Sequence, residues 1–178
     1  MPDEAVEYTI TYLEMAAPPG EMPPQPKGDI SILRADNAPL HYFLYLYGTV
    51  GAAYAWTDWF ERPQTEQRAF VEDPGTSIHT LVLEGWPAGF FMLDTRRAGL
   101  CDLAYFGLMP EAVGRGLGFW FLSRAVEAAW QQPKVEKLTV NTCTLDHPAA
   151  LTLYERRGFV PVRREVARRT GMGTRQAG

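Results

Sequence analysis

Apolar positions follow a strand-like spacing at the start of the chain and a helical spacing soon afterwards. Residues 7–15 (EYTITYLEM) alternate between polar and apolar side chains and are rich in Thr, Tyr and Ile, which predicts a strand. Residues 17–27 hold five prolines and a glycine, so we expect an extended loop there. A second short strand is expected at residues 29–33, and the spacing of Leu and aromatic residues predicts an amphipathic helix over 37–49.

Three successive strands are predicted in the middle of the chain, after a short helix at residues 65–71. They span residues 77–83, 88–94 and 100–108, and turn residues such as Gly and Pro separate them. Short connections of this kind favour antiparallel pairing of neighbouring strands, so this part of the chain is expected to form a meander.

The order of elements changes after residue 108. A helix at 116–130, a strand at 137–142, a helix at 148–156 and a strand at 159–166 follow one another. This alternation after a meander predicts an α/β (α+β) fold with a mixed, mostly antiparallel sheet flanked by helices. Residues 168–178 are rich in Gly and Arg without periodicity, so we expect a single domain over residues 1–167 and a disordered tail.

Composition and charge narrow the classes of function. The 178 residues are 46% hydrophobic and 21% charged with a net charge of −4, whereas a nucleic-acid binder needs a basic field. No apolar run reaches the roughly 18 residues of a membrane span, and the acidic start lacks the regions of a signal peptide, so we expect a cytoplasmic protein. Cys101 and Cys143 lack a CxxC spacing, which argues against a zinc site.

A glycine-rich turn leads from the strand at 100–108 into the helix that follows it. The turn consists of Val113, Gly114, Arg115, Gly116, Leu117, Gly118 and Phe119. Glycines adopt positive φ and let a ligand approach the backbone, while a helix start offers free N–H groups and partial positive charge. Together these features predict a phosphate-binding turn.

Three kinds of phosphate-binding turn compete for this segment. A Walker loop ends in Gly-Lys-Ser/Thr, which Gly118-Phe119-Trp120 does not supply. A dinucleotide fingerprint needs its third glycine one residue later and an acidic residue after the next strand. The pyrophosphate loop of acetyl-CoA enzymes, Gln/Arg-x-x-Gly-x-Gly/Ala, matches at Gly116 and Gly118, with Val113 replacing Gln/Arg. A glycine-rich connection without any ligand also stays open.

A second segment, residues 146–159 (DHPAALTLYERRGF), resembles the pattern Asn-x-x-Ala-x-x-Leu-Tyr-x-x-x-Gly-Phe of the GCN5-related N-acetyltransferase (GNAT) superfamily. The matching positions are Ala150, Leu153, Tyr154, Gly158 and Phe159, while His147 stands where the family has Asn. Because both segments occur in the family order and at the family spacing, the chain is identified as a member of this superfamily. Residues 43–51 and 142–148 are also similar to an uncharacterised bacterial subgroup of it.

The resemblance implies a GNAT fold in which two splayed strands hold acyl-CoA, with acetyl-CoA as the acyl donor. It implies that the donor is bound by three segments: the strand end at Phe106, Leu108 and Met109, the turn at residues 113–119, and the helix start at His147, Ala150 and Tyr154. A backbone N–H near Phe106–Leu108 would stabilise the oxyanion. His147 is expected either to bind pantetheine or to cap its helix, and Asp146 is a good N-cap as well.

The chemistry of acetyl transfer assigns a role to Tyr154. The attacking amine must be neutral, the oxyanion needs hydrogen-bond donors, and the departing thiolate benefits from a proton. A phenol with a pKa of about 10 lies close enough to a thiol to supply that proton. The GNAT resemblance places the family's tyrosine at Tyr154, and a packed phenol bound to the backbone is the alternative.

The candidate base is Asp102. In a regular strand its side chain points the same way as Ala104 and Phe106, and such apolar surroundings raise the pKa of a carboxyl. The distance of Asp102 from the glycine turn also resembles that of the glutamate base of some GNAT enzymes. A structural acceptor is the alternative role, and Asp146 and Glu84 are rival bases.

An aromatic-rich stretch supplies candidates for the acceptor site, because GNAT enzymes build that pocket from their early helices. We expect Tyr45, Tyr54 and Trp56 to bind the acceptor, with core packing or a dimer contact as the alternative. The expected partner is a small-molecule or peptide amine, with no nucleic acid, membrane or metal. A homodimer stays open because homodimers are common in the family.

Two other functions also stay open. The replacements at Val113 and His147 fit a degenerate member that binds acyl-CoA as a sensor without turnover. A nucleotide- or dinucleotide-binding protein is the third hypothesis.

Overall fold

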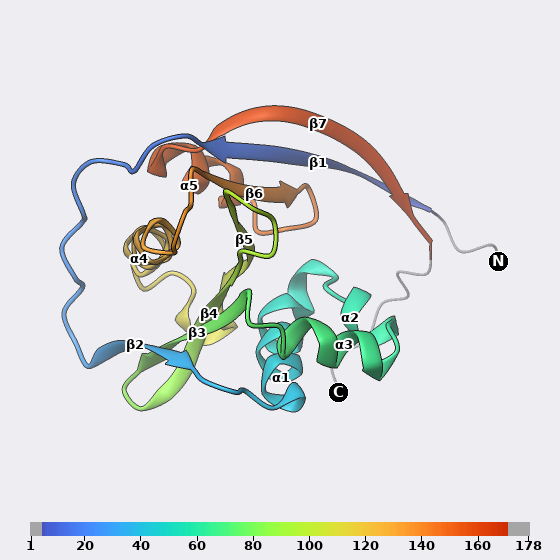
Figure 1. Cartoon of the computed structure of the whole chain (residues 1–178), viewed down its shortest axis with the longest axis horizontal. Helices are drawn as coiled ribbons and strands as arrows, with labels where there is room; N and C mark the ends of the chain where they lie inside the picture. Colours follow the sequence, from blue (N-terminus) through green and yellow to red (C-terminus); the bar gives the residue numbers. More distant parts are fainter. Residues whose placement is uncertain (1–4, 171–178) are drawn as a thin grey trace.

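The computed structural model describes residues 5–170, which form one seven-stranded mixed sheet with helices on both faces (Figure 1). The strand order is β2-β3-β4-β5-β6-β1-β7, and β5–β6 is the parallel pair in an otherwise antiparallel sheet. The strands are β1 (Val6–Met15), β2 (Ile30–Ala35), β3 (Thr76–Leu83), β4 (Trp86–Asp94), β5 (Leu100–Leu108), β6 (Lys137–Cys143) and β7 (Val160–Arg169). The predicted fold class is confirmed.

The helices divide into two groups that bury opposite faces of the sheet. They are α1 (Leu40–Gly51), α2 (Asp58–Glu61), α3 (Gln64–Val71), α4 (Gly118–Trp130) and α5 (Ala150–Arg157), with 3-10 turns η1 (Ala52–Tyr54) and η2 (Pro110–Ala112). One core cluster joins α1 and α3 to β4, and the other joins α4 to β5 and β6. None of the helices within residues 5–170 is long and apolar enough to cross a membrane.

A bulge in β5 changes which face its side chains occupy. Met92 of β4 pairs with Tyr105 and Leu93 pairs with Leu103, so Ala104 is an extra residue in the ladder. Leu103 and Phe106 consequently both pack on the α4 side, although three positions separate them. The expectation that Asp102 and Phe106 share a face is therefore wrong, because it assumed a regular strand.

The two strands that make the parallel pair separate soon after they meet. Ladder pairing between β5 and β6 covers only Leu100–Asp102 against Lys137–Thr139. Beyond that point, residues 103–108 keep their pairing with β4 except at the bulged Ala104, but they have no ladder partner on the β6 side among the described residues. This divergence leaves a free backbone edge in the middle of the sheet.

Several predicted boundaries shift in the structure. The helices expected at 116–130 and 148–156 begin two residues later, at Gly118 and Ala150. The tail expected from residue 168 is wrong for its first two residues, because β7 continues to Arg169 in its ladder with β1. The Arg169 guanidinium also donates to the Ala55 carbonyl at 3.1 Å, which ties the end of β7 to the loop after α1. Residues 171–178 lie outside the described part.

Candidate functional site

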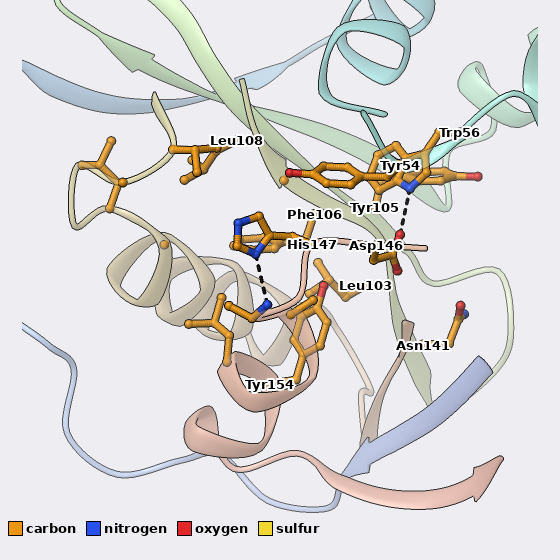
Figure 2. Close-up of a pocket in the computed structure, with 18 of the residues that line it drawn as sticks. Tyr54, Trp56, Leu103, Tyr105, Phe106, Leu108, Asn141, Asp146, His147 and Tyr154 are labelled. Atoms are coloured by element: carbon orange, nitrogen blue, oxygen red, sulfur yellow. Dashed lines mark hydrogen bonds between the residues drawn. The ribbon is translucent and has the colours of Figure 1, made fainter. Parts of the chain in front are cut away.

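A cavity of about 250 Å³ lies where β5 and β6 diverge. Its wall on one side is the free edge of β5, from Leu103 to Leu108. The glycine turn and the start of α5 close one end, and the loop after α1 closes the other (Figure 2). The cavity therefore connects the predicted phosphate-binding turn with the predicted acceptor site.

The glycine turn has the conformation that its sequence predicts. Gly114 and Gly116 adopt φ of 81° and 75°, which favours glycine, whereas Gly118 is the first residue of α4. A Cβ at Gly114 or Gly116 would meet no atom within 4 Å, so the space over the turn is open to a ligand. Val113, Gly114, Gly116, Leu117 and Gly118 line the cavity.

Two residues of the turn lie elsewhere. Arg115 is exposed and is not part of the cavity wall. Phe119 lies outside the wall as well, because its ring packs under the Arg156 guanidinium, 3.9 Å from the ring centroid. Met109 packs in the core on the α1 side, where it is 2% exposed, so its side chain cannot reach the cavity.

Tyr154 projects from α5 into the cavity, and its hydroxyl points toward Leu103 (Figure 2). The ring packs edge-on against Phe106 and Phe159, with centroids 6.2 and 5.9 Å away. Within residues 5–170 no group forms a hydrogen bond with this hydroxyl. Burial, followed by the negative charge of Asp146, raises the pKa of Tyr154 well above that of a free phenol. The phenol is thus a protonated donor that has no partner in its surroundings.

Asp102 lies in a neighbouring hollow rather than in this cavity. Its Oδ1 accepts a hydrogen bond from Thr139 Oγ1 at 2.6 Å, at the last paired position before the strands separate. Burial raises the pKa of Asp102, although the Thr139 bond opposes the shift. Asn141 lines both the hollow and the cavity, so the two spaces adjoin at this residue. The sequence carried no signal for Asn141 beyond its place at the end of a predicted strand.

Asp146 joins two loops that are far apart in the sequence. Its Oδ1 accepts from Trp56 Nε1 at 3.1 Å, and its Oδ2 accepts from Thr142 Oγ1 at 2.7 Å and Cys143 N at 2.9 Å. The prediction that Asp146 caps the next helix is wrong, because α5 begins only at Ala150. The rival base Glu84 is exposed in the β3–β4 turn, away from the cavity.

His147 occupies the position of the family's Asn and lines the cavity. Its Nδ1 accepts a hydrogen bond from Ala149 N at 3.1 Å, so the ring satisfies a backbone group just before α5 (Figure 2). The His147 and Tyr54 rings meet in a T-shaped arrangement, with centroids 6.2 Å apart. Ala150, the matching alanine of the motif, lines the same wall.

The end of the cavity beside the loop after α1 is aromatic. Tyr54 and Trp56, which are predicted to bind the acceptor, line it, and Tyr105 of β5 joins them although sequence reasoning did not single it out. Trp56 fits there because Gly51 lacks a side chain: a Cβ on Gly51 would collide with the Trp56 side chain. Tyr45 is 49% exposed on α1 and does not line the cavity.

Comparison with known proteins adds an independent line of evidence. The model of the acetyltransferase (GNAT) family matches residues 44–159. None of the curated proteins matches the chain significantly.

Solved structures resemble the chain at low sequence identity, which shows the shared fold alone. A GCN5-related N-acetyltransferase from Kribbella flavida aligns with TM-score 0.61 and 16% identity, over 93% of this chain and 59% of that one. A functionally unknown conserved protein from Staphylococcus epidermidis aligns with TM-score 0.59 and 14% identity, over 91% and 61%. The chain thus spans about three fifths of these two proteins. Spermidine N-acetyltransferase from Vibrio cholerae, in complex with CoA and spermine, aligns with TM-score 0.56 and 16% identity, over 74% and 80%.

Proposed function

Because this chain belongs to the GNAT family of acetyltransferases, we propose that it transfers an acetyl group from acetyl-CoA to a primary amine. The observation that carries the proposal is the single cavity that joins the positive-φ glycine turn, the free edge of β5 and the unpartnered Tyr154 hydroxyl. These are the three elements that binding a thioester with a pyrophosphate tail requires. Attack by the amine lone pair forms the new N–C bond, collapse of the tetrahedral oxyanion breaks the C–S bond, the nitrogen loses a proton and the departing thiolate gains one.

The residues at the turn fit a pyrophosphate group. The space above Gly114 and Gly116 is open, and a Cβ at either position would occupy it. The start of α4 adds free N–H groups and partial positive charge next to the turn. Residues 103–108 would hold the extended part of the donor along their free edge, as an added strand does.

We assign Tyr154 to the departing sulfur. Its raised pKa keeps the phenol protonated across the neutral range, so the hydroxyl can donate a hydrogen bond to the thiolate as it forms. The same raised pKa makes complete proton transfer less favourable than for a free phenol. Stabilisation of negative charge on sulfur is therefore the main role proposed for this residue.

We assign Asp102 to the removal of a proton from the acceptor ammonium, which gives the neutral amine that attacks. Burial shifts the pKa of its carboxyl upward, toward that of the group it must deprotonate. Because Asp102 faces the hollow beyond Asn141, the proton would pass through water between the two spaces. Asp146 is the rival base, since it lines the cavity itself.

A degenerate member that binds acyl-CoA without turnover is the second candidate. It is favoured by Val113, which lines the turn without the usual polar side chain, and by His147, whose Nδ1 is already used by Ala149. This function would use the same binding surface without needing an acceptor.

Calorimetry and a thiol-release assay test both candidates. We expect acetyl-CoA to bind with micromolar Kd, NAD and ATP to bind far more weakly, and a panel of primary amines to include at least one that yields free CoA. Binding of acetyl-CoA without thiol release from any amine would favour the degenerate member. Tighter binding of NAD or ATP than of acetyl-CoA would overturn both.

A further inference from the structure

The cavity contains very little charge. Among the described residues that line it, Asp146 is the one Asp, Glu, Lys or Arg. No lysine or arginine within residues 5–170 forms an ion pair with Asp146. The negative charge at the acceptor end is therefore not neutralised by the protein.

Hydrogen bonds hold the Asp146 carboxylate in place, but they do not use all of its acceptor positions. Its Oδ2 accepts from Thr142 Oγ1 and Cys143 N, while its Oδ1 accepts only from Trp56 Nε1. A carboxylate oxygen can accept two hydrogen bonds, so Oδ1 keeps one free. Its charge is felt nearby, because after burial Asp146 is the next cause that raises the pKa of Tyr54. A cationic ligand that donates a hydrogen bond to Oδ1 would fill the free acceptor position and neutralise the carboxylate charge.

The Trp56 and Tyr105 side chains beside Asp146 each have their polar group engaged in a hydrogen bond. The Trp56 N–H is bound to Asp146, and the Tyr105 hydroxyl accepts from Trp59 Nε1 at 2.6 Å. The Trp56 and Tyr105 rings lie 5.4 Å apart at an angle of 56°, and Tyr54 stands 6.5 Å from Trp56. Ring faces of this kind bind apolar groups and cations. Within the described part of the chain, no lysine or arginine stands among them to balance the charge of an anion.

We infer that the acceptor is a cationic primary amine on an apolar or aromatic body, with no carboxylate or phosphate beside the amine. The inference rests on the proposed acetyl transfer and specifies its substrate class. The ammonium would pair with Asp146, and the body would lie against Trp56 and Tyr105. An α-carboxylate on the same molecule would meet the uncompensated charge of Asp146 with no positive side chain in the wall to balance it.

Matched pairs of ligands test this class directly. Each pair joins an amine to its carboxylated counterpart: tryptamine with tryptophan, phenethylamine with phenylalanine, and hexylamine with 6-aminohexanoate. Binding is measured by calorimetry with CoA present, so the result does not depend on turnover. We expect at least tenfold tighter binding of the amine in the two aromatic pairs, where the carboxylate sits beside the amine, and a smaller difference in the hexyl pair. Equal or tighter binding of tryptophan and phenylalanine, or no binding by any of the three amines, would overturn the inference.

Substitution locates the preference at Asp146. Asp146→Asn keeps the size of the side chain and removes its charge, so the aromatic pairs should then differ by less than about threefold. Asp36→Asn, an exposed carboxylate in the loop before α1, should keep the full preference. Trp56→Phe should weaken the binding of the amines in both aromatic pairs, whereas the matched change Trp130→Phe at the end of α4 should leave their binding unchanged. Tyr54 lies on the cavity wall beside His147. Tyr54→Ala therefore provides a second test should Asp146→Asn lower the melting temperature.

The failure of the inference and that of the proposed function give different results. If carboxylated acceptors release CoA at the same rates as the amines, the inferred acceptor class is overturned and the proposed acetyl transfer is not. If the amines bind selectively but no CoA is released, the cation-binding site is supported and the proposed transfer reaction is overturned.

Discussion

The proposed donor end and the proposed acceptor end of the cavity are built by different means. At the donor end, positive φ at Gly114 and Gly116 and the start of α4 present backbone N–H groups. At the acceptor end, the side chains of Trp56, Tyr105 and Asp146 come from three separate segments. A backbone site depends on local conformation, whereas a side-chain site depends on how distant elements pack.

This difference predicts which departures from the family pattern the chain can tolerate. Val113 and His147 replace side chains at the donor end, yet the turn keeps its conformation. The acceptor end depends on one side chain, because Asp146 alone accepts from the Trp56 N–H and supplies the charge of the wall. We therefore expect donor binding to be robust to side-chain changes and acceptor binding to be sensitive to them.

The largest effect is expected where the two ends meet. Tyr154→Phe should lower kcat by about 10³-fold, the upper end of the range for losing one hydrogen-bond donor to a developing negative charge, because the sulfur loses its donor. The Kd for acetyl-CoA should change less than about twofold, as the ring still packs on Phe106 and Phe159. Steady-state kinetics and calorimetry measure the two quantities. Undiminished kcat would remove Tyr154 from the mechanism.

A second change affects catalysis without affecting either binding end. Asp102→Asn should lower the rate at neutral pH by about 10²-fold, because the amide keeps the Thr139 bond but cannot accept a proton. The base works only when ionised, so in the native protein kcat should rise with pH through the raised pKa of Asp102, and the variant should lose this rise. Asp94→Asn is the comparison variant: it should keep the rise but move it to lower pH, because the Asp94 charge helps to raise the pKa of Asp102. An unchanged pH profile in Asp102→Asn would assign the base elsewhere.

A third change should affect the donor end alone. Gly116→Val forces a branched side chain into positive φ and fills the space over the turn, so the Kd for CoA should rise about 30-fold. Acceptor binding should be unaltered. Gly85→Val imposes the same backbone conflict, at φ 85° in the β3–β4 turn, and controls for general strain. Equal CoA affinity in both variants would contradict a ligand at the turn.

The reciprocal change should affect the acceptor end alone. A Cβ in Gly51→Ala would collide with Trp56 and displace its indole from Asp146, so amine binding should weaken about tenfold. The Kd for CoA should stay within about twofold. Thermal unfolding should record a lower melting temperature as well, because the displaced ring leaves its contact with Tyr47. Loss of CoA affinity together with amine affinity would show that the two ends are not separate.

The smallest effect is expected at the position that departs from the family motif. His147→Asn restores the family residue, and the Asn side chain can also accept from a backbone N–H near Ala149. CoA affinity should therefore change by less than about threefold in either direction, measured by calorimetry. A gain of tenfold or more would mean that His147 weakens donor binding in this chain and would favour the degenerate member.

Much of the donor end was predictable because its parts are contiguous. The glycine turn and the motif from His147 to Phe159 each lie within one short segment, and local conformation follows from local sequence. The family and the order of most elements followed from the same patterns. Met109 and Phe119 were misplaced, since their roles depend on which core or which arginine they pack against.

The arrangement of the acceptor end could be seen only in the folded chain. The bulge at Ala104 moves Asp102 and Phe106 to opposite faces, and no alternation of polar and apolar residues reveals where a ladder gains a residue. The pairing of Trp56 with Asp146 likewise joins loops that meet only because β5 and β6 diverge and α1 packs closely at Gly107. Short segments encode a backbone conformation that binds a common group such as pyrophosphate. The choice of a particular amine resides in long-range packing, which fixes side chains that the sequence leaves far apart.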